Sequence, residues 1–301
     1  MNHTPVVNPP VVQVKKYSGL AAFLNPVARK IFRKRMILLD FPVNPIQRWD
    51  DGNPHPDLYE IINSNRSSYA ELLKSFLEFR EKFLRISVRP ETNSSSEPSW
   101  INGWMPGLDG VALYSLVATR KPKCFLEVGS GNSTKFARKA ITDHRLNTKI
   151  ISIDPHPRVE IDALCDQIIR KPVEAIRLDI FDQLEAGDIL YVDNSHRAFM
   201  NSDATVIFLD VIPKLKPGVL VEIHDVTLPY DYPKIWIDRY YSEQYLLAAY
   251  LLAKGRRFDI LLPNGFVSCD NELNNILAPL WREPKMKDVE THGGSFWIRM
   301  N

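Results

Sequence analysis

The chain has 301 residues, of which 45% are hydrophobic and 25% charged, and its formal net charge is +2. This length accommodates one large domain with an extension or two modest domains, and the composition is ordinary for a globular protein. The near-neutral charge gives no electrostatic reason to expect nucleic acid as a partner. No apolar run approaches the roughly 18 residues that a membrane-spanning helix needs.

Residues 1–99 are predicted to form an N-terminal extension, partly disordered at first and then helical. The short basic amphipathic stretch 27–36 suits either a membrane or nucleic-acid surface or a solvated helix face. We favour the solvated face, because stable membrane anchoring takes two signals and this is one short turn. In residues 56–86 apolar side chains recur at three- and four-residue spacing, which predicts two helices with a break near 65–68.

The polar segment 91–99, ETNSSSEPS, predicts a domain boundary, so a second domain is expected to span residues 100–301. The loop 100–110 carries Trp100 and Trp104 and either covers a ligand or packs into the core. Asp109 is predicted to be the N-cap of a helix that runs to Val117.

Strand patterns then alternate with helical ones, which predicts an α/β fold with a parallel sheet and helices on both faces. The strands are expected at residues 124–128, 150–153, 167–170, 189–192, 219–223, 258–262 and 295–300. Helices are expected at 133–141, 158–164 and 201–215, and a long one begins near Ser242.

A glycine-rich turn joins the first of these strands to its helix, in the sequence FLEVGSGNST of residues 125–134. Glycine permits a sharp turn and a close approach of the backbone to a ligand, while a helix N-terminus offers unpaired N–H groups. The candidate ligand-binding residues here are Glu127, Gly129, Ser130, Gly131, Asn132 and Ser133. Thr134 stands where the dinucleotide fingerprint has its third glycine, which counts against a nicotinamide cofactor.

Asp154 ends the next expected strand, about one strand–helix unit after the glycine turn. At this distance a carboxylate accepts hydrogen bonds from the ribose hydroxyls of a bound nucleoside. Alternatively, Asp154 only caps the turn before Pro155. The glycine-rich turn one unit earlier favours the interpretation that Asp154 binds a ligand.

These motifs resemble those of the class I S-adenosylmethionine-dependent methyltransferases, from about Trp104 to the end of the chain. The resembling segments are EVGSGNST, SIDP, DILYVDNSH, LKPGVLVEIHDV and GGSFWIRM. The resemblance implies a Rossmann-like, doubly wound, mostly parallel seven-stranded sheet whose last strand is antiparallel. It also implies that residues 127–132 wrap the methionine part of the cofactor, that Asp154 holds the ribose, and that Val173 and Glu174 border the adenine.

Acidic and histidine residues end the fourth and fifth expected strands, where the ligand crevice of such a sheet lies. Asp193 and His196 follow strand four, and His224 and Asp225 follow strand five. Some small-molecule O-methyltransferases of the resembling class hold a divalent metal with carboxylates at these positions. Asp193, His224 and Asp225 are therefore candidate metal ligands. A metal-free alternative makes either histidine the general base near neutral pH.

The sequence therefore predicts an enzyme that transfers a methyl group from S-adenosylmethionine to a small molecule, at oxygen rather than nitrogen. The alternatives are an NAD-dependent oxidoreductase and a non-catalytic cofactor-binding module whose N-terminal helices dock a partner. Nucleic acid and stable membrane anchoring are not expected, and a homo-oligomer remains open. The three cysteines form no CxxC pair, which fits a reduced, cytoplasmic setting.

Overall fold

The structure is a computed structural model, and it describes residues 43–90, 96–253, 255 and 257–301. The chain divides into two compact units, Met1–Pro45 and Ile46–Asn301. The second unit contains every helix and strand described below. The basic stretch 27–36 and the first part of the polar segment, 91–95, lie outside the described residues.

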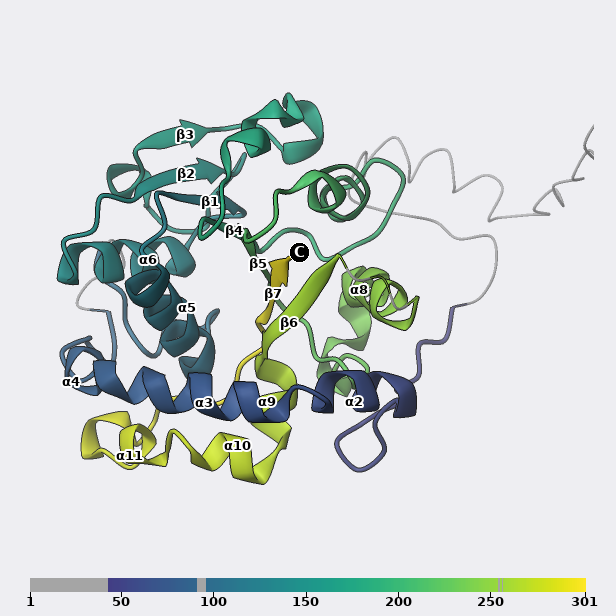
Figure 1. Cartoon of the computed structure of the whole chain (residues 1–301), viewed down its shortest axis with the longest axis horizontal. Helices are drawn as coiled ribbons and strands as arrows, with labels where there is room; N and C mark the ends of the chain where they lie inside the picture. The colour runs from purple at the N-terminus through teal and green to yellow at the C-terminus, as the bar shows by residue number, and fades with distance from the viewer. Residues whose placement is uncertain (1–42, 91–95, 254, 256) are drawn as a thin grey trace, which may run out of the picture. The chain divides into compact units, whose positions relative to one another are not determined.

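A seven-stranded sheet organises the second unit, with the strand order β3-β2-β1-β4-β5-β7-β6 (Figure 1). The first five strands run parallel, and β7 is antiparallel to both of its neighbours. The strands are β1 (Cys124–Val128), β2 (Lys149–Ile153), β3 (Gln167–Ile169), β4 (Ile189–Val192), β5 (Leu220–Ile223), β6 (Phe258–Pro263) and β7 (Phe296–Met300). The doubly wound, mostly parallel Rossmann-like sheet is thus confirmed. Its strand order reverses between β1 and β4, which is where such sheets bind ligands.

Helices cover both faces of the sheet, as the burial of parallel strands requires. Figure 1 shows α5 and α6 packed together on one side of the sheet and α8 on the other. The helices are α2 (Pro56–Asn63), α3 (Arg66–Phe76), α4 (Arg80–Phe83), α5 (Gly107–Arg120), α6 (Asn132–Asp143), α7 (Asp203–Val206), α8 (Glu243–Leu252), α9 (Asn264–Cys269), α10 (Asn271–Asn275) and α11 (Ala278–Trp281). None of the helices in the described parts of the chain is long and apolar enough to cross a bilayer.

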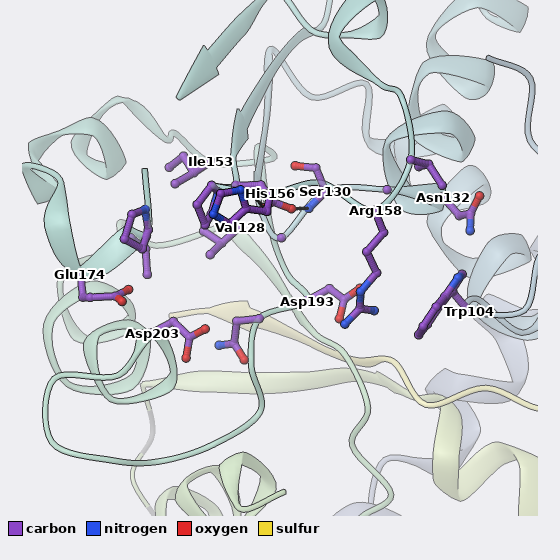
Figure 2. Close-up of a pocket in the computed structure, with 18 residues that line it drawn as sticks. Trp104, Val128, Ser130, Asn132, Ile153, His156, Arg158, Glu174, Asp193 and Asp203 are labelled. Atoms are coloured by element: carbon purple, nitrogen blue, oxygen red, sulfur yellow. Dashed lines mark hydrogen bonds between the residues drawn. The ribbon is translucent and has the colours of Figure 1, made fainter. Parts of the chain in front are cut away.

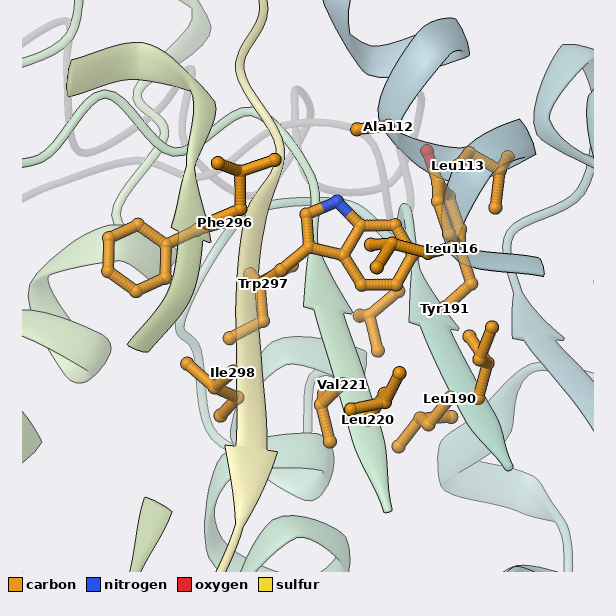
Figure 3. Packing of buried hydrophobic residues seen from close by; sticks show 14 of the residues in the cluster. Ala112, Leu113, Leu116, Leu190, Tyr191, Leu220, Val221, Phe296, Trp297 and Ile298 are labelled. Atoms are coloured by element: carbon orange, nitrogen blue, oxygen red, sulfur yellow. The ribbon is translucent and has the colours of Figure 1, made fainter. Parts of the chain in front are cut away.

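The core lies between α5 and the sheet. Helix α5 is buried continuously from Gly107 to Ala118, as expected for a helix that is apolar on all sides. Trp297 of β7 is fully buried, and its ring centroid lies 6.2 Å from that of Tyr191 on β4 (Figure 3). Leu116 of α5 packs over this pair (Figure 3). These large buried aromatic side chains therefore pack β4 and β7 together beneath α5.

Helices α2 to α4, which precede the predicted domain boundary, belong to the same compact unit as the sheet. The ring of Phe83 in α4 is fully buried and lies 5.3 Å from that of Tyr114 in α5. An ion pair between Arg66 and Asp270 links α3 to the start of α10, which runs alongside it in Figure 1. The domain boundary expected after Ser99 stays a prediction. The described residues before and after it contribute to one hydrophobic core.

Asp109 is not the N-cap of its helix, because α5 begins at Gly107 with Pro106 in the cap position. The Asp109 side chain is fully buried and accepts hydrogen bonds from Asn264 Nδ2 (2.7 Å), Gly294 N (2.8 Å) and Ser295 N (2.9 Å). Its carboxylate thus links α5 to the turn before β7. The role of Asp109 is to hold these two elements together and not to cap its own helix.

The helix expected at 158–164 is wrong, since only Asp162–Leu164 forms a single 3-10 turn. A helix of seven residues is marginal unless tertiary packing stabilises it. The segment is instead held at its edges by arginine side chains from other elements. Arg138 donates two hydrogen bonds to the carbonyl of Leu164 (2.8 and 2.6 Å), and Arg170 donates one to the carbonyl of Asp154 (3.1 Å).

Candidate active site

A pocket of about 330 Å³ opens at the carboxyl ends of β1, β2 and β4 (Figure 2). This volume lies within the roughly 300–1,000 Å³ typical of small-ligand sites. Its lining includes the predicted residues Gly129, Ser130, Gly131, Asn132, Asp154, Val173, Glu174 and Asp193. The strand-order reversal places their side chains around one space, although they come from four different segments of the chain.

Gly129 makes the close approach of β1 and β4 possible. Its φ of +82° lies in the left-handed region, and a Cβ atom there would overlap the backbone carbonyl of Asp193. Gly131 is different, because its φ is 176° and a Cβ would find Val159 Cγ2 at 3.8 Å as its nearest neighbour. The first glycine therefore shapes the sheet, whereas the second leaves open space toward the pocket.

Glu127 and Ser133 lie beneath the pocket and are not part of its lining. The fully buried Glu127 carboxyl accepts hydrogen bonds from Ser133 Oγ and from Thr134 Oγ1 at the start of α6. Burial raises the pKa of Glu127 to about 8, against the opposing effect of these two hydrogen bonds. In the structure this residue joins the end of β1 to the first turn of α6.

Asp154 stands at the end of β2, and its carboxylate faces both the glycine turn and the pocket. Its Oδ2 accepts a hydrogen bond from Ser130 N (2.8 Å), and its Oδ1 accepts one from His156 N (2.7 Å). Each carboxylate oxygen has a further lone pair. Asp154 therefore holds the turn in shape and can still accept a hydrogen bond from a ligand.

Glu174 lies at the opposite end of the pocket from Trp104 (Figure 2). Its Oε2 atom is buried and has no hydrogen-bond partner among the described residues. A buried acceptor left without a donor is costly, so this atom is a natural partner for a ligand N–H group. Val173 and Pro172 give the same end an apolar wall.

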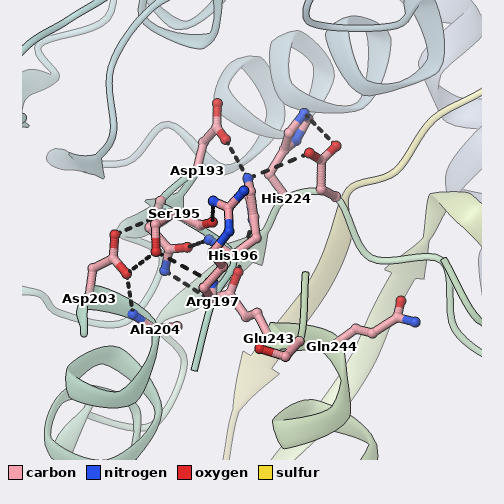
Figure 4. Close-up of polar contacts among 12 residues, drawn as sticks. Asp193, Ser195, His196, Arg197, Asp203, Ala204, His224, Glu243 and Gln244 are labelled. Carbon is pink, nitrogen blue, oxygen red and sulfur yellow. Dashed lines mark hydrogen bonds and ion pairs between the residues drawn. The ribbon is translucent and has the colours of Figure 1, made fainter. Parts of the chain in front are cut away.

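His196 is enclosed by carboxylates at the side of the pocket (Figure 4). Its Nδ1 lies 3.0 Å from Glu243 Oε2, and its Nε2 lies 3.1 Å from Asp193 Oδ1 and 3.5 Å from Asp225 Oδ2. Burial alone would lower the pKa of His196, but the hydrogen bonds and charges of these carboxylates raise it well above its ordinary value. Both ring nitrogens of His196 thus face carboxylate oxygens, an arrangement that favours the protonated imidazole.

His224 has a similar arrangement on β5. Its Nδ1 lies 3.1 Å from Glu222 Oε1, and its Nε2 is 4.0 Å from Asp225 Oδ1. Burial opposes the charge, but Glu222, Asp193 and Asp225 raise the pKa of His224 well above its ordinary value. Both histidines thus place Nδ1 against a buried glutamate and direct Nε2 toward Asp225.

Of these crevice residues, only Asp193 reaches the pocket lining, where its side chain is 34% exposed. Burial alone would raise the pKa of Asp193, but His196, His224 and Arg158 together hold it below its usual range. His196 and Asp225 both have left-handed φ values, 57° and 54°. Non-glycine residues in this region concentrate at functional sites, because such strain is kept only where the surrounding structure enforces it.

The predicted metal site is not supported. Within the described residues, no group of three or more histidine, cysteine, aspartate or glutamate side chains is arranged to hold a metal ion. The proposed ligands Asp193, His224 and Asp225 are instead paired within the cluster, and a protonated imidazole has no lone pair to offer a metal.

Sequence reasoning missed three side chains that build this site, Glu222, Glu243 and Arg158, whereas the sequence predicts that the loop of Trp104 either covers a ligand or packs into the core. Glu222 precedes His224 by two residues on one strand, so strand periodicity places both on the same face and could have indicated the pair. No comparable signal marked Glu243, which reaches His196 from the start of α8. Trp104 and Arg158 lie at one end of the pocket, and no pattern in the sequence pairs them.

A family model described as a methyltransferase domain matches residues 126–226, from β1 to just beyond β5. No curated protein matched the chain.

Several solved structures share the fold with low identity. The SAH-bound methyltransferase PaMTH1 of Podospora anserina is 17% identical, with 87% of this chain and 99% of that one covered and a TM-score of 0.38. The O-methyltransferase of Bacillus cereus in complex with SAH is 15% identical, with 63% and 82% covered and a TM-score of 0.34. TomG of Streptomyces achromogenes, an O-methyltransferase involved in tomaymycin synthesis and bound to SAM, is 14% identical, with 77% and 90% covered and a TM-score of 0.35.

Proposed function

We propose that the chain is a class I S-adenosylmethionine-dependent methyltransferase that methylates an oxygen atom of a small molecule, in keeping with the methyltransferase-domain model that matches residues 126–226. The observation that supports this is the position of Asp193, an ionised carboxylate exposed in the same pocket as the glycine turn and Asp154. Cofactor-binding and proton-accepting groups then share one space of small-molecule size.

The pocket residues fit the cofactor. Asp154 has free lone pairs for ribose hydroxyls, and the unpartnered Oε2 of Glu174 suits an amino donor such as that of adenine. S-adenosylmethionine supplies an electrophilic methyl group on a positively charged sulfur. The carboxylates that line the pocket suit a cationic ligand of this kind. They are Asp154, Glu174, Asp193 and Asp203.

Asp193 is the group that we propose accepts the proton of the acceptor hydroxyl. As the oxygen begins to bond to carbon, its proton becomes far more acidic, so a carboxylate with a lowered pKa is basic enough to take it. His196 and His224 carry positive charge and keep Asp193 ionised. Their raised pKa values do not suit either histidine to be the neutral base, and we propose them as positioning groups.

The assignment is tested first by ligand binding. Calorimetric titration of the protein should show binding of S-adenosylhomocysteine (SAH), the demethylated product of the cofactor, and no binding of NAD. The absence of the third glycine at Thr134 is the reason to expect this discrimination. Binding of NAD without binding of SAH would replace the methyltransferase assignment with an oxidoreductase.

The catalytic cluster is tested by turnover against a panel of hydroxyl- and amine-bearing acceptors. Asp193→Asn and His224→Ala should each lower kcat by about 100-fold or more, because each removes the proton acceptor or the charge that holds it. The affinity of His224→Ala for SAH should change little, since His224 does not line the pocket, and any loss of SAH affinity in Asp193→Asn should be much smaller than its loss of turnover. Asp210→Asn, which removes an exposed carboxylate outside this pocket, is the matched control. Wild-type turnover in both cluster variants would show that the reaction centre lies elsewhere.

Removal of metal provides a separate prediction. Rigorous chelation should leave turnover unchanged, because the imidazoles of the cluster are bonded to carboxylates and are unavailable as ligands. Loss of activity that one divalent ion restores would contradict the metal-free arrangement.

A further inference from the structure

Arg158 lines the pocket, yet within the described residues its guanidinium has no hydrogen bond and no ion pair. The arginines that flank the same wall are engaged. Arg138 pairs with Asp166 (2.7 Å), and Arg170 pairs with Asp162. A guanidinium carries five N–H donors in a rigid planar fork that matches a carboxylate. Arg158 therefore presents unused donors of this kind to the pocket.

The Arg158 guanidinium is held on an aromatic platform. Its Cζ atom lies 4.3 Å from the ring centroid of Trp104, whose side chain is 59% exposed. Asn102 fixes the platform, because its Oδ1 accepts hydrogen bonds from Trp104 N (3.0 Å) and Met105 N (2.8 Å). The same oxygen accepts from Asn132 Nδ2 (3.2 Å) at the start of α6. Trp104 is exposed but anchored, and the stack orients the guanidinium plane.

The charges are distributed unevenly along the pocket. Figure 2 shows Arg158, Trp104 and Asn132 at one end, with Asp193 beside Arg158, and Glu174 and Asp203 at the other. The charge of Arg158 acts on Asp193, but the two side chains form no ion pair. Of the described residues that line the pocket, Arg158 is the one lysine or arginine. A ligand whose amino group pairs with Glu174 would direct its far end toward Arg158. An anionic group at that far end would meet the guanidinium.

We propose that Arg158, stacked on Trp104, binds the α-carboxylate of the amino-acid part of S-adenosylmethionine. The inference rests on the proposed function, and it assigns the orientation of the cofactor in the pocket, with adenine toward Glu174 and the amino acid toward Trp104. It also gives the exposed tryptophan a role, because Trp104 supports the residue that closes this end of the site.

Two ligands that differ in the amino-acid part provide the test. SAH carries the α-carboxylate, whereas 5′-methylthioadenosine has the adenosyl group and sulfur without the amino acid. In calorimetric titrations, Arg158→Gln should weaken SAH binding about 10- to 100-fold, the scale of lost charge-assisted hydrogen bonds, and leave methylthioadenosine binding unchanged. Arg177→Gln, which removes an exposed arginine paired with Asp179 outside the pocket, should change neither affinity. Trp104→Ala should show a smaller loss that is also selective for SAH.

Three outcomes would overturn the inference. Unchanged SAH affinity in Arg158→Gln would show that the guanidinium does not meet the cofactor carboxylate. Equal losses for SAH and methylthioadenosine would place its effect on the adenosyl part or on the fold. Unchanged SAH affinity with a raised KM for carboxylate-bearing acceptors would assign Arg158 to the substrate instead. Failure of the wild-type protein to bind SAH would overturn the proposed function itself, so the two failures are distinguishable.

Discussion

Gly129 and Gly131 are separated by one residue, but they meet different constraints. Gly129 cannot carry a side chain without overlapping the Asp193 carbonyl, whereas Gly131 has open space. We expect Gly129→Ala to lower the free energy of unfolding by several kcal/mol, because steric overlap adds to an unfavourable φ. Gly131→Ala should keep most of the stability and still weaken SAH binding by about tenfold, through a methyl group placed in the pocket.

Urea denaturation and calorimetry of these two variants separate folding from binding. The sequence alone suggested that bulk at Gly129 would block the cofactor, and the structure shows that it would first disturb β1 against β4. A stable Gly129→Ala protein that lacks only SAH binding would contradict this reading.

Glu127 makes the stability of the protein depend on pH. Burial raises its pKa from an ordinary 4.5 to about 8, so the folded state binds a proton that the unfolded state releases. The contribution is fully present below about pH 4.5 and is lost as the pH rises toward 8. Its upper bound is about 5 kcal/mol over that range, since one pKa unit corresponds to about 1.4 kcal/mol.

Replacement of Glu127 should therefore flatten the pH profile. We expect the free energy of unfolding of the wild-type protein to fall between pH 5 and 8 more steeply than that of Glu127→Gln. The comparison is made by urea titration at several pH values, with Glu60→Gln on the exposed face of α2 as control. Parallel profiles for wild type and Glu127→Gln would show that another group binds the proton. Glu222, whose burial raises its pKa to about 7, is the next candidate.

At the scale of elements, Asp109 connects helix α5 to the entry of β7. Its carboxylate accepts three hydrogen bonds from buried donors, and Asp109→Ala would leave all three without a partner. We expect a loss of roughly 3 kcal/mol or more in the free energy of unfolding. Asp109→Asn retains one acceptor oxygen and should lose less. Equal stability of all three proteins in urea would show that water replaces the carboxylate.

The strands and the helices differ in how far the sequence could specify them. β1 and β4 match their predicted bounds, because each is a short apolar run that ends at turn or polar residues. The helix expected at 158–164 is absent, and only Asp162–Leu164 forms a 3-10 turn. Local pattern specifies an element when burial dominates, whereas a short helical pattern is marginal and depends on tertiary packing.

The candidate site shows the same distinction. The glycine turn and Asp154 could be identified because both sit at fixed offsets from strands. Glu222 could be inferred from strand periodicity, whereas Glu243, which is 47 residues from His196, depends on tertiary contact. The raised pKa values of the two histidines depend on these partners, so a neutral base could be predicted from the sequence but the opposing effect of the carboxylates could not.

For the whole molecule, truncation tests how much of the chain the catalytic unit needs. A chain that begins at Ile46 should fold and bind SAH, because this unit contains the complete sheet and pocket. A chain that begins at Trp100 lacks α2 to α4, including the buried Tyr69, Phe76 and Phe83. It should expose apolar surface and lose cooperative unfolding. Thermal denaturation compares the unfolding transitions of the two truncated chains. Full stability of the chain that begins at Trp100 would establish the predicted boundary after Ser99.

The position of β7 has a consequence for synthesis. This strand lies between β5 and β6, so both have an unpaired edge until Phe296–Met300 has left the ribosome. A nascent chain that has already emerged through β6 therefore carries open hydrogen-bonding edges and the space that Trp297 will fill. Such intermediates are prone to aggregation. The sheet can thus be completed only after β6 has been synthesised, when β7 joins β5 to β6.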